Sequence, residues 1–151
     1  MTTPGINGLP KVQLHSADGA SAEIYLHGAH LTSWKTADGC ERLFMSPRSE
    51  FKPGAAIRGG VPVIFPQFSG LGPLPKHGFA RNHAWELVPT NGGEATLRFE
   101  GNEETDKLWP HRFRTELTFR IAGKTLEMTL KVENTGETSF AFHAALHGYF
   151  A

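Results

Sequence analysis

Two sets of histidines in this sequence have neighbours that bear on acid–base chemistry. The first is His77, which lies between two cations in the run Lys76-His-Gly-Phe-Ala-Arg81. Nearby positive charge lowers the pKa of an imidazole and favours its neutral form. A neutral imidazole donates a hydrogen bond from one nitrogen and accepts one at the other. His77 is therefore a candidate contact for a hydroxylated or anionic ligand; a loop histidine bonded to backbone is the alternative.

The second set is His143 and His147, which are four residues apart near the end of the chain. On a helix they would share a face and could bind one metal ion. Their aromatic-rich surroundings favour a strand, on which four residues span about 13 Å. Zinc ligands must each lie about 2 Å from the metal, so we expect no metal site. A strand would carry both histidines, Ala145 and Tyr149 on one face, as a pocket wall or as a half-exposed sheet face.

A stretch from Phe51 to Trp85 contains no Asp or Glu, although the whole chain has 15. It holds four of the Lys and Arg residues: Lys52, Arg58, Lys76 and Arg81. It is also the part of the chain richest in Gly and Pro, whose tight turns allow close backbone approach. Fixed cations on rigid turns suit an anion site. A solvated basic loop is the alternative, because unpaired surface charges are common.

Other kinds of catalytic site find little support. No Gly-x-Ser-x-Gly elbow is present, and Cys40 lies in a turn-like segment without a nearby base. Neither a Walker sequence nor a dinucleotide-binding Gly-rich fingerprint occurs. The remaining histidines show no partner pattern, and we expect surface or capping roles for His15, His27, His30, His83 and His111.

The elements that must position these residues are strands. Apolar and polar residues alternate with a period of two over 22–27, 97–100, 116–121 and 126–133. The last two runs form a predicted hairpin across 122–124, and other turn signals include Asn-Gly-Gly93. No sustained helical stripe appears, and 17 Gly and 10 Pro disfavour long helices. The pattern predicts an all-β, antiparallel β-sandwich in which several strands have one solvent-exposed face.

Composition limits the classes of protein. The 151 residues include 15 Lys and Arg against 15 Asp and Glu, a balance that argues against nucleic-acid and membrane-surface partners. The single Cys40 excludes an internal disulfide and a cysteine-based zinc site. No signal-peptide core is present, and no apolar run approaches the roughly 20 residues that span a membrane. We expect one cytoplasmic domain, residues 1–151.

Several segments, in order and spacing, resemble the aldose 1-epimerase superfamily and, within it, the glucose-6-phosphate 1-epimerase (hexose-6-phosphate mutarotase) branch. They are His27-Gly-Ala-His-Leu-Thr-Ser-Trp34, Leu43-Phe-Met-Ser-Pro47, Ala56-Ile-Arg-Gly-Gly-Val-Pro-Val-Ile-Phe-Pro-Gln67, Lys76-His-Gly-Phe-Ala-Arg81 and Phe142-His-Ala-Ala-Leu-His-Gly-Tyr-Phe150. The Arg-Gly-Gly-x-Pro and His-Gly-x-Ala-Arg pair is specific to the hexose-phosphate branch. The resemblance extends over nearly the whole chain.

This resemblance implies a galactose mutarotase-like β-sandwich that interconverts the α and β anomers of a hexose 6-phosphate without a cofactor. A general acid protonates the ring oxygen while a general base deprotonates the anomeric hydroxyl. The resemblance gives His147 the acid role and places His77 near the reacting centre. It assigns the phosphate to Arg58 and Arg81, whose guanidinium groups form bidentate contacts, and Gln67 to the pocket wall.

In the family, the chain continues beyond the histidine strand and supplies a glutamate base. We therefore expect residues 1–151 to be the N-terminal half of a mutarotase-like fold, incomplete at its C-terminus, with the base absent. The alternatives are a non-catalytic sugar-phosphate-binding β-domain and a half-domain that dimerises. Exposed strand edges would favour such self-association.

Overall fold

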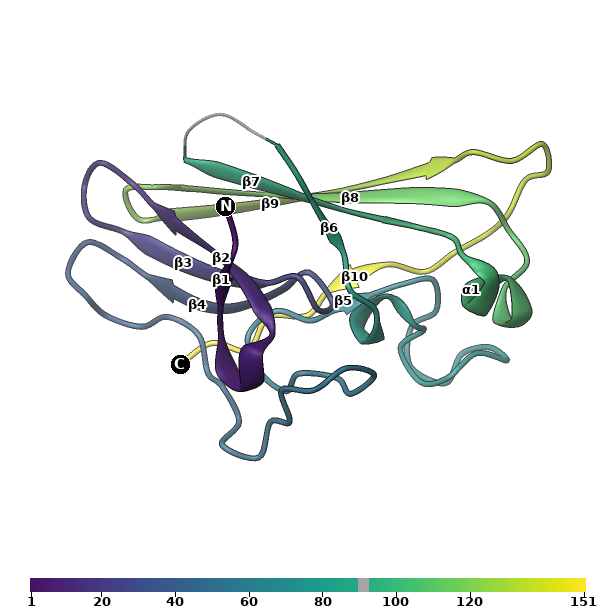
Figure 1. Ribbon diagram of the computed structural model, residues 1–151, viewed down its shortest axis with the longest axis horizontal. Coiled ribbons are helices and arrows are strands. Elements are labelled where there is room, and N and C mark those ends of the chain that lie inside the picture. The colour runs from purple at the N-terminus through teal and green to yellow at the C-terminus, as the bar shows by residue number, and fades with distance from the viewer. Residues whose placement is uncertain (90–92) are drawn as a thin grey trace.

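The computed structural model describes residues 1–89 and 93–151 as two layers of antiparallel strands. One layer has the order β1-β2-β3-β4, from Thr3–Pro4, Pro10–His15, Ser21–Tyr25 and His30–Lys35. The other has the order β6-β7-β8-β9, from Glu86–Val88, Glu94–Glu100, Phe113–Ala122 and Thr125–Asn134. Figure 1 shows β7–β9 above β2–β4, which confirms the predicted sandwich. The turn predicted at 91–93 lies in part outside the described residues.

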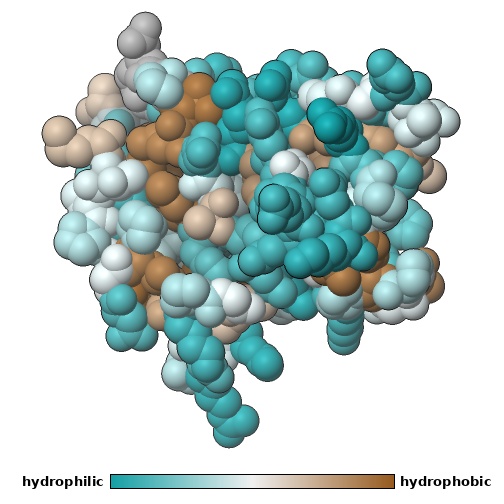
Figure 2. Space-filling model, turned by 45° about the vertical axis from the view of Figure 1, so that its right-hand side comes forward, coloured by the Kyte–Doolittle hydropathy of each residue, from teal (hydrophilic) through white to brown (hydrophobic). Residues whose placement is uncertain are grey.

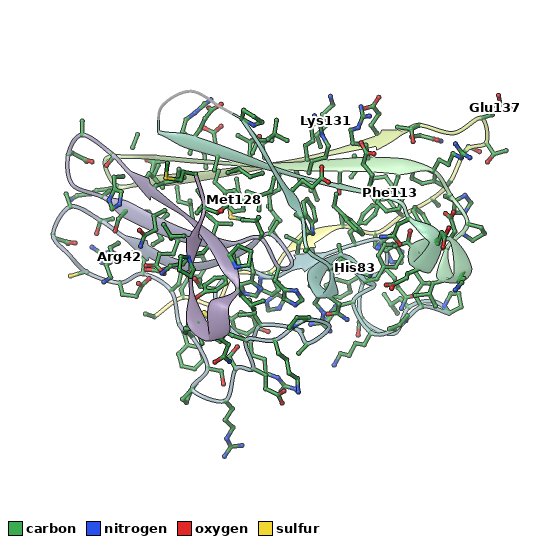
Figure 3. All side chains as sticks on the ribbon, viewed as in Figure 1. Arg42, His83, Phe113, Met128, Lys131 and Glu137 are labelled. Atoms are coloured by element: carbon green, nitrogen blue, oxygen red, sulfur yellow. The ribbon has the colours of Figure 1, made fainter. Side chains whose placement is uncertain are left out.

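The period-two alternation becomes the core because successive side chains of a strand point to opposite faces. In β8 the residues at alternate positions are buried, from Phe113 through Phe119 to Ile121. They pack with Ala95, Leu97 and Phe99 of β7 and with Ile24 and Leu31 of the other layer. In Figure 3, Phe113 lies on the inner side of its sheet, and its ring contacts those of Phe65 and Phe79.

The predicted hairpin of β8 and β9 is confirmed, with an unbroken register from Phe113↔Asn134 to Ala122↔Thr125. Gly123 makes the turn at φ 59°, where a side chain would be strained. β9 is the edge of its sheet and no residue of it is fully buried. In Figure 3, Met128 points toward the interior and Lys131 away from it.

The C-terminal segment forms less strand than its composition predicted. A two-stranded ladder joins β10 (Ala145–Leu146) to β5 (Val63–Ile64). Beyond it, the backbone nitrogens of His143 and His147 donate to Pro66 O and Pro62 O, at 2.8 and 3.2 Å. The ladder stays short because a proline has no N–H with which to return such a bond. The segment is nevertheless extended along 60–66, as a strand interpretation requires.

In the described parts of the chain, three short helices complete the fold: η1 (Ile6–Gly8), η2 (Ala80–Asn82) and α1 (Glu103–Leu108). The side chain of Asn102 caps α1 by accepting from the backbone nitrogens of Glu104 and Thr105, and Thr105 Oγ1 accepts from the Asn102 nitrogen. This reciprocal pairing satisfies donors that a helix start leaves open. Among the described residues, none of the helices has the length and apolar character needed to cross a membrane.

Candidate functional site

Most of the residues that line a cavity of about 410 Å³ come from the acid-free segment. Three residues singled out from the sequence line it: Arg58, His77 and Arg81. Tyr149 and Pro62 contribute from the C-terminal segment and its partner. The lining residues include no Asp or Glu among those the structure describes. Three of the four cations of the acid-free segment, Arg58, Lys76 and Arg81, thus line one cavity, and their role in binding an anion stays a prediction.

The loop that carries Arg58 is held by its glycines. Gly59 and Gly60 have φ values of 99° and 57°, and a Cβ on Gly59 would lie 2.5 Å from Phe44 O. The Gly60 nitrogen donates to the same Phe44 oxygen at 2.7 Å. The Arg58 nitrogen donates to Ser49 Oγ at 2.9 Å. The backbone at Arg58 is thus fixed, while the residue itself is exposed and lines the cavity.

The loop that carries His77 fixes which ring nitrogen bears the proton. The Ser69 backbone N–H donates to His77 Nδ1 at 3.0 Å, so the proton of the neutral ring sits on Nε2. Burial, Arg81, Lys76 and His147 together lower the pKa of His77. The sequence-based expectation attributed a lowered pKa to the flanking cations alone; burial, which it did not consider, is the larger cause. His77 presents a neutral N–H donor at neutral pH.

Arg81 is the more enclosed of the two arginines. Its Nη2 donates to Lys76 O at 3.0 Å, and its buried Nε has no hydrogen-bond partner. Burial and then the charge of Arg58 lower its pKa, against an opposing effect of Tyr149. Within residues 1–89 and 93–151, no carboxylate forms an ion pair with Arg58 or Arg81. A bound anion would satisfy the Nε donor and relieve the repulsion between the two cations.

His147 lies beside the cavity. Its backbone nitrogen donates to Pro62 O, and its exposed ring lies 4.7 Å, centroid to centroid, from the ring of Tyr149. The charge of His147 also acts on His77, which places the two imidazoles in the same region. Tyr149 lines the cavity; the sequence placed it on the same strand face but assigned it no role.

Gln67 is buried, and its side-chain amide is used within its own loop. Nε2 donates to Ser69 O and Leu74 O at 2.9 and 3.0 Å, and Oε1 accepts from the Leu74 nitrogen at 2.8 Å. Gln67 is not among the residues that line the cavity of Arg58 and Arg81. The structure thus places three of the five predicted site residues, Arg58, His77 and Arg81, in the lining of the cavity, with His147 beside it and Gln67 in a neighbouring loop.

His143 is held apart from His147 by the extended backbone. Its Nδ1 accepts a hydrogen bond from the Phe68 nitrogen at 3.1 Å, which directs the ring toward a different loop. In the part of the chain that the structure describes, no three His, Cys, Asp or Glu side chains gather as metal ligands would.

Two further histidines contact this region, and sequence reasoning missed them. The expectation of surface or capping roles is wrong for His27 and His30, which are 4% and 0% exposed. Their Nε2 atoms donate to Ala55 O at 2.5 Å and Gly59 O at 2.6 Å, on either side of Arg58. Their shared place in the family-like segment 27–34 was the available signal, since periodicity alone does not reveal a buried imidazole.

The sequence is similar to known proteins. The sequence model of a family described as aldose 1-epimerase matches residues 10–151. A protein from Cenchrus ciliaris named "Putative glucose-6-phosphate 1-epimerase" is 40% identical over 156 residues, which cover 95% of this chain and 47% of that protein. A protein of the same name from Escherichia coli (strain K12) is 44% identical over 135 residues, covering 85% and 44% of the two chains.

A solved structure shows the same architecture. The crystal structure of a "putative mutarotase" from Salmonella typhimurium superposes with a TM-score of 0.79 at 34% identity, covering 99% of this chain and 54% of that one. The chain spans about half the length of the curated relatives it matches. The match to the family model over residues 10–151 shows that this chain belongs to the aldose 1-epimerase family.

Proposed function

We propose that this chain carries the phosphate-binding and acid-bearing part of a hexose-6-phosphate 1-epimerase. The observation that carries the proposal is the convergence of Arg58 and Arg81, neither paired with a carboxylate of the described residues, on one cavity that His77 also lines. A phosphate dianion matches two guanidinium groups in both charge and geometry. The names of the relatives point to the same substrate class.

The proposed reaction exchanges the two anomers through the open-chain sugar. His147, as the imidazolium, gives a proton to the ring oxygen while a base removes the proton of the anomeric hydroxyl, so the C1–O5 bond breaks and an aldehyde forms. Rotation about C1–C2 presents the other face, and the reverse proton transfers close the ring. An imidazole suits this role because its ordinary pKa lies near working pH. His77 Nε2–H serves as a neutral donor to a sugar oxygen.

The general base is proposed to come from outside residues 1–151. The lining of the cavity offers no Asp or Glu among the described residues, and the chain covers 47% and 44% of two relatives. In this proposal the present chain is a single domain that forms the N-terminal half of the fold, working in the cytoplasm. Gln67 is left out of the site because its amide is used in its own loop.

A second candidate is a half-domain that dimerises, as distinct from a monomeric sugar-phosphate-binding domain without catalysis. β9 is an edge strand of ten residues, and such edges can pair with another chain. Large apolar side chains, among them Leu108, Phe142 and Phe150, are also exposed. Figure 2 shows one face on which brown apolar patches lie between teal polar side chains.

Two measurements separate these candidates. Magnetisation-transfer NMR on glucose 6-phosphate gives the rate of anomer exchange with the 151-residue chain and with a longer chain that includes the following strands. Catalysed exchange by the longer chain alone would support the divided site. If neither chain exceeds the buffer rate while glucose 6-phosphate still binds, the epimerase proposal is wrong. Light scattering tests self-association, and a monomer at all concentrations would remove the second candidate.

A further inference from the structure

We propose that the turn His27–His30 is a positioning element that sets the separation of the two arginine-bearing loops, with His27 and His30 acting through the backbone on either side of Arg58. The inference rests on the proposed phosphate site, because it says what holds that site in shape. Neither histidine touches the ligand in this proposal. Both are positioning residues.

Two hydrogen bonds from buried histidines hold the Arg58 loop. His27 Nε2 donates to Ala55 O at 2.5 Å, and His30 Nε2 donates to Gly59 O at 2.6 Å. These carbonyls lie three residues before and one residue after Arg58, so the two bonds span the base of the loop. Both imidazoles are buried, where a lost hydrogen bond leaves a carbonyl without water to replace the donor.

The same turn, His27–His30, also contacts the Arg81 segment. Gly28 has φ 74°, and its nitrogen donates to His83 O at 2.7 Å. A Cβ at this position would lie 2.6 Å from Arg81 O and 3.1 Å from Arg81 Cα. A glycine is therefore required for the turn to lie directly against the backbone of Arg81. Four consecutive residues thus contact the supports of both arginines.

β4, the strand that begins at His30, also holds the Arg58 loop in place. A Cβ on Gly60 would clash with Leu31 O and lie 3.2 Å from His30 Nε2. The Val61 nitrogen donates to that Leu31 oxygen at 2.9 Å. The Arg58 loop therefore rests on β4 itself, and the buried β2–β3–β4 sheet defines where the loop can lie.

The His30 imidazole holds the loop without adding its own charge beneath it. Burial lowers the pKa of His30 to about 4; the hydrogen bond to Gly59 opposes this effect, and the charges of His27 and Arg81 reinforce it. At neutral pH His30 is a neutral donor, with its proton on Nε2 because a carbonyl can only accept. Its buried Nδ1 has no partner. The cavity thus keeps the positive charge of the arginines without an additional cation behind them.

The test compares His30→Leu with His30→Gln in the 151-residue chain. Leucine fills the buried space without a donor, whereas the Gln side-chain nitrogen can reach the Nε2 position. The control is Thr115→Val, which removes a buried bond from Thr115 Oγ1 to Phe99 O, 3.1 Å, in the other sheet. Calorimetry gives the affinities for glucose 6-phosphate, inorganic phosphate and glucose.

We expect His30→Leu to weaken glucose 6-phosphate and inorganic phosphate about tenfold, which corresponds to one lost hydrogen bond, with glucose unchanged. His30→Gln should stay within about threefold of the parent chain, and Thr115→Val should lower stability without changing any affinity. Parent-like phosphate affinity in His30→Leu would overturn the proposal, as would an equal loss for glucose. If His30→Leu does not fold, the pair His27→Leu and His27→Gln gives the same comparison at Ala55 O.

A readout without ligand separates this inference from the proposed function. Hydrogen exchange should increase at the Gly60 amide of the Arg58 loop and at the Gly28 amide beside Arg81 in His30→Leu, and not in Thr115→Val. If the parent chain binds no phosphate, the proposed function fails, and the exchange data still decide whether the turn couples the loops. Faster exchange confined to Gly60 would show that the turn supports one loop only, and the inference would then be wrong.

Discussion

The arginines of the β7–β8 sheet and those of the loop cavity differ in their partners. On the sheet, Arg98, Arg114 and Arg120 each form an ion pair with a glutamate on the neighbouring strand, at 2.7, 2.6 and 2.6 Å. The strand register places these pairs directly opposite one another. In the cavity, Arg58 and Arg81 have no such partner among the described residues. The same residue type therefore forms ion pairs across the sheet in one region and, in our proposal, binds an anion in the other.

The difference arises from local sequence. A strand presents side chains at fixed spacing, so a complementary register pairs charges at small cost. The loops from Phe51 to Trp85 contain no acid and no long ladder. Their shape comes from positive-φ glycines and from bonds to the buried turn at His27–His30. Unpaired cations persist there because the backbone, and not a carboxylate, holds them in place.

The largest expected effect is on catalysis beside the cavity. In a form of the protein that catalyses anomer exchange, His147→Ala should slow the exchange by about 10²–10⁴-fold, because a positioned acid contributes on that order. Magnetisation-transfer NMR measures the rate, and glucose 6-phosphate affinity should change little. His15→Ala, on the exposed side of β2, is the control. An unchanged rate in His147→Ala would remove it from the acid role.

A second expected effect concerns stability against pH. His30 has a folded-state pKa of about 4, below its ordinary 6.5, so unfolding takes up a proton as the pH falls below about 6.5. Stability present above that pH is lost progressively toward pH 4, by about 3 kcal/mol. His30→Gln should flatten this part of the curve in urea unfolding. A variant that keeps the full pH dependence would show that other groups cause it.

A third expected effect separates the two sets of arginines. Arg58→Ala or Arg81→Ala should weaken glucose 6-phosphate by about 10–100-fold, since a hydrogen bond to a charged group contributes about 1.5–3 kcal/mol. Glucose, which has no phosphate, should bind as before. Calorimetry gives both constants, with Arg98→Ala on the sheet as the matched control. Equal losses for the two sugars would contradict the phosphate role.

The smallest expected effect is on the sheet itself. Arg120→Ala removes an exposed ion pair with Glu94, and exposed pairs contribute about 0–1 kcal/mol to the free energy of unfolding. Urea unfolding should show a change within that range, and affinity for glucose 6-phosphate should be unaffected. A change in that affinity would mean that the sheet and the cavity are coupled. The statement that their arginines have separate roles would then be wrong.

The strands were predictable because apolar and polar residues alternate along consecutive positions of the sequence. The hairpin of β8 and β9 follows from period-two runs around Gly123, and the structure has that register. The cation-rich cavity was predictable from the absence of acids between Phe51 and Trp85. Both features depend on residues close in sequence.

The features that escaped sequence reasoning depend on contacts that no periodic pattern of residues encodes. The burial of His30 follows from its contact with Gly59, 29 residues later. The brevity of β10 follows from Pro62 and Pro66 in the partner segment. The amide of Gln67 is used by Leu74, which lies within the same loop but outside any periodic pattern. No local pattern encodes such pairings.

The sparse backbone bonding of the C-terminal segment has a consequence for local unfolding. His143, His147 and Tyr149 donate backbone bonds to 60–66, where Pro62 and Pro66 return none, and residues 149–151 are bonded to 42–44 around the Leu43↔Phe150 bridge. A segment held by few bonds opens at lower free energy than a full ladder does. The histidine-bearing segment should therefore detach from the molecule before the arginine loops, which are anchored on the buried sheet. Under mild denaturant the loops of the proposed anion site would stay folded after the segment that carries the proposed acid has detached.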